Sequence, residues 1–180
     1  MNRFILWLEK EATWKNIFLW IFLAYFINFS YIFLIFIVSD IARVGSLADF
    51  VENLPVHYFI LLCVFSWFLE EVVFRFIPIA ASVRIFGKKY KIFIVLILVS
   101  GLFGFLHGGW SFIFFQGFCG LTLCLLYLKC GGLSTEYLKQ SSFFDKTKFF
   151  FKKHSKALFA STVAHAMFNF SIYVVVYLYL

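Results

Sequence analysis

Three long stretches of this chain contain no charged residue: 16–39, 92–128 and 157–180. A helix of about 20 mostly apolar residues spans a bilayer core, so each stretch is long enough to cross one. Only 14% of the residues are charged, whereas a typical soluble domain has about a quarter. Since a water-soluble core does not require so much apolar surface, the chain is predicted to be an integral membrane protein.

Five helices are expected to cross the membrane, and their ranges are 16–39, 56–84, 92–107, 111–128 and 157–180. The uncharged stretch 92–128 is too long for one span, and Gly108 and Gly109 offer a break within it. Helices satisfy their own backbone hydrogen bonds, as the hydrocarbon core requires. The predicted fold class is therefore all-α, a polytopic bundle of about five transmembrane helices.

The chain is expected to form a single membrane domain over residues 1–180, because its length allows only one. The polar residues described below place the functional core within 56–175. Two segments lie outside the expected spans. Residues 1–15 are predicted to form an interfacial helix, and 135–156 form a basic, Phe-rich insertion that is expected to lie on the cytoplasmic side, at anionic headgroups.

Positive charge alternates between the connecting segments. The N-terminal segment, the loop 85–91 and the insertion 135–156 are rich in Lys and Arg, whereas the loop 40–55 has only Arg43. The positive-inside rule then places the N-terminus in the cytoplasm and the C-terminus outside, in the cell membrane, with a bacterial plasma membrane as the expected setting. The net charge of +7 thus comes from Lys and Arg residues that flank the expected spans and anchor them at the membrane surface. No nucleic-acid partner is expected.

Three ionisable residues lie within the second expected span: Glu70, Glu71 and Arg75. An ionised side chain at the bilayer centre costs about 2.5–3.5 kcal/mol on insertion scales, so such residues are rare and commonly functional. Glu71 and Arg75 share one helix face and can pair, and a structural ion pair explains these two as readily as a function does. That pair leaves Glu70 without a local cation. Neighbouring carboxyl groups in a low dielectric retain protons more readily than in water, which makes Glu70 the first candidate for activating water.

His107, His165 and Asn169 are further polar residues in apolar surroundings. His107 ends the third expected span, where a lone histidine is more often structural than catalytic. His165 and Asn169 are four residues apart within the last span, so their side chains face the same way. We interpret them either as a polar pair that holds membrane helices together or as hydrogen-bond donors to a developing oxyanion.

The order and spacing of these residues resemble those of a known family. The motifs are Glu70-Glu71-x-x-x-Arg75, Phe103-x-x-x-His107 and His165-x-x-x-Asn169. Each motif alone is a weak signal, but three in this order on separate apolar helices are specific. The arrangement resembles the CPBP family of CAAX proteases and bacteriocin-processing enzymes, also called Abi proteins, which includes the type II CAAX prenyl endopeptidases. The resemblance covers roughly 56–169.

The resemblance implies a glutamate-dependent intramembrane endopeptidase whose partners are the lipid bilayer and a membrane-associated peptide or protein substrate. By this resemblance Glu70 and His107 hold and activate the attacking water. His165 and Asn169 stabilise the oxyanion. The adjacent ion pair supports the site, with Arg75 orienting the two carboxyl groups. In a bacterial setting, leader peptides, pheromones or sorted surface proteins are expected as substrates rather than prenylated proteins.

Two features depart from this family pattern. Family members usually have more spans, and a Gly-rich helix usually runs directly into the last motif helix. Here Gly131 and Gly132 are followed by the basic insertion 135–156. The insertion is interpreted either as a cytoplasmic amphipathic helix or as a gate for substrate.

The depths of the motif residues pose a geometric difficulty. At about 1.5 Å per residue, Glu70 and His165 fall nearer the cytoplasmic side, whereas His107 falls near the outer end of its span. The three side chains meet only if the third span is tilted or set deep, or if the boundaries shift by a turn. A polar cavity inside the bundle is therefore predicted.

Other functions remain open at this point. The main alternative is a non-enzymatic role, as a bacteriocin-immunity protein or a membrane scaffold. Two Glu and two His are plausible zinc ligands, but no HExxH motif is present, so no cofactor is expected and zinc is kept as an alternative. A transporter is disfavoured by five spans without an internal repeat. The four cysteines are interpreted as small buried hydrophobes: Cys63, Cys119, Cys124 and Cys130.

Overall fold

The computed structural model describes residues 3–39, 65, 67–86, 89–110, 112–133 and 142–179. Within these residues the chain is helical apart from short connections, and it contains no strand. Three segments are long and apolar enough to cross a membrane, namely Ile17–Leu34, Phe112–Gly132 and Thr147–Val174, and the apolar helix Lys91–Leu106 is shorter. The predicted fold class, a helical membrane bundle, is confirmed.

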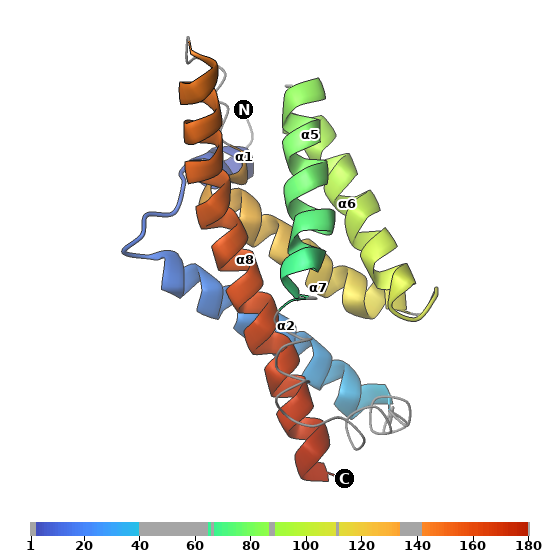
Figure 1. Cartoon of the computed structure of the whole chain (residues 1–180). Helices are drawn as coiled ribbons and strands as arrows, with labels where there is room; N and C mark the ends of the chain where they lie inside the picture. Colours follow the sequence, from blue (N-terminus) through green and yellow to red (C-terminus); the bar gives the residue numbers. More distant parts are fainter. Residues whose placement is uncertain are drawn as a thin grey trace.

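The elements follow one another as α1 (Arg3–Glu9), α2 (Ile17–Ser39), the π-helical segment η1 (Val72–Phe76), α5 (Ile77–Phe86), α6 (Lys89–Leu106), α7 (Phe112–Tyr127), the π-helical segment η2 (Leu128–Gly132) and α8 (Phe143–Tyr179). In Figure 1, α5 and α6 stand side by side, and α7 crosses the bundle in contact with α6, α8 and α2. The helix α2 contacts α8, crosses it obliquely in Figure 1 and continues toward the end of the bundle that carries the C-terminus. The short helix α1 lies toward the opposite end, against η2.

Several predicted boundaries agree with the structure. The helix α2 begins and ends within one residue of the predicted span 16–39. The predicted glycine break is also present, because α6 ends at Leu106, Gly109 has a φ of 82° and α7 begins at Phe112. A positive φ at this turn favours glycine, which has no Cβ to clash with its own backbone. The second span is helical from 67 to 86, and its predicted first part, 56–64, lies outside the described residues.

The last helix differs from its prediction. It begins at Phe143, so the described part of the basic insertion continues directly into the predicted span 157–180. No Pro or Gly lies between Phe143 and Lys156, and nothing in this segment therefore interrupts the helical hydrogen bonds. His165 consequently lies much deeper in its helix than a start at Ala157 implies.

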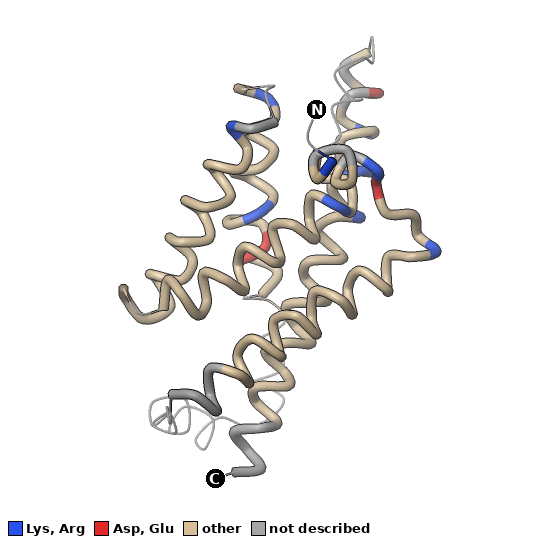
Figure 2. Tube along the Cα trace, turned by 180° about the vertical axis from the view of Figure 1, so that it is seen from behind, with Lys and Arg blue, Asp and Glu red and all other residues tan. Residues whose placement is uncertain are grey.

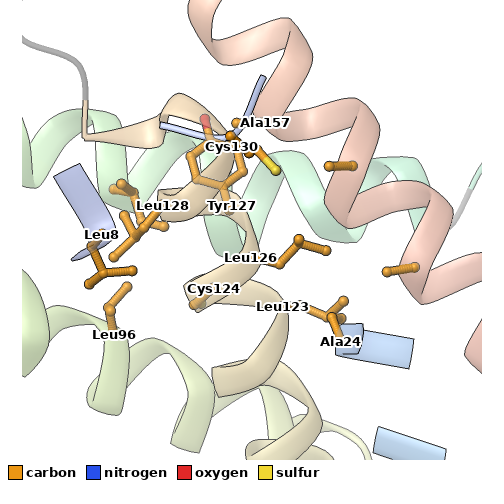
Figure 3. Packing of buried hydrophobic residues seen from close by; sticks show 14 of the residues in the cluster. Leu8, Ala24, Leu96, Leu123, Cys124, Leu126, Tyr127, Leu128, Cys130 and Ala157 are labelled. Carbon is orange, nitrogen blue, oxygen red and sulfur yellow. The ribbon is translucent and has the colours of Figure 1, made fainter. Parts of the chain in front are cut away.

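The apolar core is centred on α7 and its extension η2, which contact most of the other helices. Figure 3 shows Leu123, Cys124, Leu126, Tyr127, Leu128 and Cys130 of this segment beside Leu8, Ala24, Leu96 and Ala157. Buried alanines along α8, such as Ala160 and Ala164, allow close approach of neighbouring helices. Cys119, Cys124 and Cys130 are free and buried, as interpreted from the sequence, whereas Cys63 lies outside the described residues.

Polar contacts fasten the N-terminal segment to the bundle. Both carboxyl oxygens of Glu11 accept hydrogen bonds from α8, one from Lys153 at 2.6 Å and the other from Lys156 at 2.5 Å. The ammonium group of Lys129, in η2, donates to the backbone carbonyls of Trp7 and Lys10. Since the α1 side chain of Leu8 is also buried in the core, this segment is an attached part of the bundle.

The Glu11 contacts predict a dependence of stability on pH. Burial raises the pKa of the Glu11 carboxyl, but the hydrogen bonds from Lys153 and Lys156 outweigh it and hold the pKa below its ordinary value of 4.5. A carboxyl with a depressed folded-state pKa stabilises the fold above its unfolded-state pKa, and this contribution disappears as the pH falls through the folded-state pKa.

We therefore expect the melting temperature of the wild type in detergent to fall below pH 4.5 more steeply than that of Glu11→Gln. Thermal unfolding of both proteins across this pH range measures the difference. Above this range, Glu11→Gln is expected to be the less stable protein because it lacks the ionic contacts. Parallel pH curves for the two proteins would contradict the assignment.

Candidate active site

The two adjacent glutamates lie where the second predicted span changes its helical geometry. Residues 67–71 are α-helical, and the π-helical segment η1 follows directly after Glu71 and contains Arg75. A π-helical turn holds one more residue than an α-helical turn, and such turns recur at functional sites. The sequence pattern predicted an unbroken α-helix here, so η1 is a feature that only the structure reveals.

One half of the site is a buried network around Glu71. Its Oε1 atom lies 3.0 Å from Nη1 of Arg75 and 2.9 Å from Nδ1 of His165. Both Glu71 and Arg75 are fully buried, with 0% of either side chain exposed. An ionised carboxylate only accepts hydrogen bonds, so Nδ1 of His165 is the donor in this contact. The predicted Glu71–Arg75 pair is therefore present, and it also fixes the orientation of His165.

The ring of Phe103 packs against three members of the site. The guanidinium carbon of Arg75 lies 4.4 Å from the centre of this ring, a cation–π contact. The ring centres of His107 and His165 lie 4.3 Å and 6.0 Å from it. The Phe103 carbonyl also lies 2.7 Å from Nδ1 of His107 and can only accept, so this Nδ1 carries the hydrogen.

The other half of the site is a meeting point of one carboxylate and two imidazoles. Oε2 of Glu70 lies 3.8 Å from Nε2 of His107 and 3.6 Å from Nε2 of His165. This oxygen is buried and has no hydrogen-bond partner among the described residues. Both distances exceed a direct hydrogen bond, but one water molecule can contact two atoms at this separation.

The structure thus brings five of the six predicted site residues together: Glu70, Glu71, Arg75, His107 and His165. The geometric difficulty disappears because α8 starts earlier than predicted and places His165 at the depth of His107. Asn169, one turn beyond His165 on α8, is partly buried, and no hydrogen bond among the described residues joins it to the others. Phe103 appeared in the sequence only as a motif position, and its packing against three site residues was not predicted.

A metal ion in a protein is typically held by several His, Cys, Asp or Glu side chains that converge on one point. Among the residues that the structure describes, no group of three or more His, Cys, Asp and Glu side chains is arranged to hold a metal ion. The expectation that no cofactor is used, with zinc as the alternative, therefore stays a prediction.

Comparison with known proteins gives one family match. Residues 52–138 match the family model described as Type II CAAX prenyl endopeptidase Rce1-like. The matched segment contains Glu70, Glu71, Arg75 and His107, and it ends before His165. The predicted resemblance to CAAX proteases is confirmed by this match. No curated protein and no solved structure gave a match.

Proposed function

With the Rce1-like match supporting a CAAX-type intramembrane protease, we propose that this chain hydrolyses a peptide bond of a membrane-associated peptide by a glutamate-dependent mechanism. The observation that carries the proposal is the position of Glu70 Oε2 between Nε2 of His107 and Nε2 of His165. A carboxylate beside an imidazole lone pair offers two acceptors to one water molecule, as activation of that water requires.

The proposed reaction begins with water held by Glu70 and His107. Because the hydrogen of His107 is on Nδ1, its Nε2 lone pair faces the carboxylate. The water can therefore donate one hydrogen bond to Nε2 of His107 and one to the Glu70 carboxylate. The water oxygen bonds to the carbonyl carbon of the peptide while one proton passes to Glu70. The tetrahedral intermediate then collapses, its carbon–nitrogen bond breaks, and Glu70 returns the proton to the leaving amine.

His165 is proposed to stabilise the oxyanion of the intermediate. The Glu71 carboxylate holds its Nδ1–H and so fixes the ring with Nε2 toward the site, and in the proposed step a hydrogen on Nε2 is donated to the oxyanion. This arrangement parallels the carboxylate that orients the histidine of a serine protease. Asn169 is proposed as the second donor, reached by rotation of its partly buried side chain once substrate is bound.

Substitution of His107 by Gln tests this proposal. The flexible Gln amide does not place an acceptor where the Nε2 lone pair of His107 holds the water, so the water is misplaced and cleavage of a membrane-anchored peptide is expected to fall by about a hundredfold. The rate is measured with purified protein in detergent, with Lys152→Gln, an exposed substitution on α8 remote from the site, as the matched control. Unchanged cleavage by His107→Gln, with its unfolding temperature also unchanged, would remove His107 from the mechanism.

A further inference from the structure

The ring of His165 must keep one direction for its two nitrogen atoms to serve the site. Nδ1 lies 2.9 Å from Oε1 of Glu71, and Nε2 lies 3.6 Å from Oε2 of Glu70. The torsion that turns a histidine ring about its Cβ–Cγ bond has broad, roughly twofold preferences, so the side chain does not fix this direction by itself. After half a turn, carbon atoms would lie where the two nitrogen atoms are now. Neighbouring side chains must therefore hold the ring.

The hydrogen bond to Glu71 holds only one edge of the ring. At the other edge, the distance from Nε2 to Glu70 is longer than a direct hydrogen bond, and Nε2 has no other hydrogen-bond partner among the described residues. Figure 2 shows acidic residues and a basic residue close together within the bundle, among mostly uncharged residues of the surrounding helices. Packing against uncharged side chains is what remains to hold this edge.

Two aromatic rings from different helices pack on His165. The ring centre of Phe103 lies 6.0 Å from that of His165, with an angle of 74° between the planes. The ring centre of Trp67 lies 6.4 Å away, with an angle of 32°. Both separations fall within the range of interacting aromatic pairs, about 4.5–7 Å. Phe103 is itself packed against the ring of Phe74 and the guanidinium group of Arg75, so it is a firm support for the histidine.

Trp67 reaches His165 from the same helical turn as Glu71. Residues 67–71 are α-helical, and Trp67 precedes Glu71 by four residues, so both side chains lie on one face of this helix. Trp67 is buried, whereas Phe68 and Leu69 directly after it are each 44% exposed. One turn of helix therefore supplies His165 with both a hydrogen-bond acceptor and an aromatic ring.

We infer that Trp67 is a positioning residue, which holds the ring of His165 so that Nε2 stays directed into the site. In the proposed function, on which this role rests, a hydrogen on Nε2 is donated to the oxyanion. Trp67 acts through His165 and is not assigned a contact with substrate. Because a displacement of about 1 Å in a reacting group can cost about a hundredfold in rate, loss of this packing is expected to lower kcat and to leave KM nearly unchanged.

Two substitutions at this position test the role of the indole ring. Trp67→Leu keeps an apolar side chain without an aromatic face, whereas Trp67→Phe keeps a planar ring. Cleavage of a membrane-anchored peptide is measured in detergent, below the lowest melting temperature of the set. We expect Trp67→Leu to lower kcat about tenfold to a hundredfold with little change in KM, and Trp67→Phe to retain most of the rate. Phe68→Leu, an exposed neighbour, is the matched control with unchanged kcat.

Three outcomes of these kinetics would overturn the inference. The first is a kcat of Trp67→Leu equal to that of the wild type. The second is a raised KM with unchanged kcat, because Trp67 would then contact substrate instead of acting through His165. The third is an equal loss of kcat in Trp67→Leu and Trp67→Phe, since the aromatic ring would then have no special role. Should Trp67→Leu fail to fold, Trp67→Met, which is flexible and apolar, supplies the same comparison.

The motion of the His165 ring gives a readout that does not require catalysis. The four histidines are labelled with ¹⁵N for nuclear magnetic resonance, and the signal of His165 is identified by its loss in His165→Gln. One sharp signal is expected in the wild type and in Trp67→Phe, and a doubled or exchange-broadened signal in Trp67→Leu. Equally sharp signals in all three proteins overturn the inference. Absence of cleavage by the wild type, with these signals as expected, counts against the protease and not against the positioning role.

Discussion

Glu70→Gln is expected to lower the rate of peptide cleavage about 10²- to 10⁴-fold while leaving the melting temperature in detergent close to that of the wild type. The amide cannot accept the proton that water releases, so general-base catalysis is lost. Glu70 makes no direct hydrogen bond to the residues around it that the structure describes, and its side chain is 26% exposed. Removing its charge therefore costs the fold little.

Its neighbour provides the matched comparison. Glu71→Gln keeps the size of the side chain but removes the counter-charge of Arg75, which is fully buried. Removing one partner of a buried ion pair costs about 3–5 kcal/mol, because the remaining charge is left uncompensated. We expect a large loss of melting temperature for Glu71→Gln, together with loss of cleavage as the orientation of His165 relaxes.

Substitutions at these two adjacent positions are thus expected to have different effects: Glu70→Gln lowers the rate of cleavage alone, whereas Glu71→Gln also lowers the melting temperature. Thermal unfolding in detergent and cleavage of one membrane-anchored peptide are measured for both variants and the wild type. Equal losses of melting temperature would contradict the division into a buried and an open half of the site. Cleavage by Glu70→Gln at the wild-type rate would exclude Glu70 as the base.

Gly104→Ala is expected to have the second large effect, through the packing of α6 on α7. A Cβ at Gly104 would lie 2.5 Å from the Phe112 carbonyl oxygen and 2.7 Å from the Gly117 backbone nitrogen. Backbone atoms cannot rotate away as a side chain can, so the two helices must separate. Overpacking of this kind commonly costs about 1–3 kcal/mol. Since His107 lies one turn beyond Gly104, the same movement displaces it from Glu70 and lowers cleavage.

Gly101→Ala is the matched control on the same helix. A Cβ at Gly101 would meet nothing within 4 Å, and Ala is better than Gly within a helix by about 1 kcal/mol. The control is therefore expected to be as stable as the wild type or more stable, with unchanged cleavage. Melting temperature and cleavage rate are compared for both variants, and similar results for the two would contradict the close packing of α6 and α7.

Much of the helical arrangement follows from the uncharged stretches of the sequence and from the glycines that interrupt them. The lengths of uncharged stretches predict α2 and the break at Gly108 and Gly109, because a helix that crosses hydrocarbon must exclude charges over its whole length. The i and i+4 spacing of Glu71 and Arg75 also predicts their ion pair, since this contact lies within one helix. The three motifs indicate which polar residues belong to one site.

The contacts between helices could not be predicted from the sequence and are known only from the tertiary structure. The sequence places Glu70, His107 and His165 on three separate helices, and their depths appear mismatched because the start of α8 is hidden within a basic, Phe-rich segment. Helix direction, crossing angle and the π-helical turn η1 decide where these side chains meet, and none of them has a local sequence signal. Long-range packing also decided that Glu71 and Arg75 are fully buried, whereas the side chains of Glu70 and His107 are partly exposed.

The sequence by itself therefore determined that the chain is a helical membrane protein and which ionisable residues lie within it. Burying a charge in hydrocarbon is costly, so membrane-spanning segments appear in the sequence as long uncharged stretches, and the few ionisable residues within them are easily identified. Only the tertiary structure decided that Glu71 is the buried partner of both Arg75 and His165, and that Glu70 faces the two histidines. Two adjacent glutamates are equivalent in a sequence, and they become different only through what the neighbouring helices place against each.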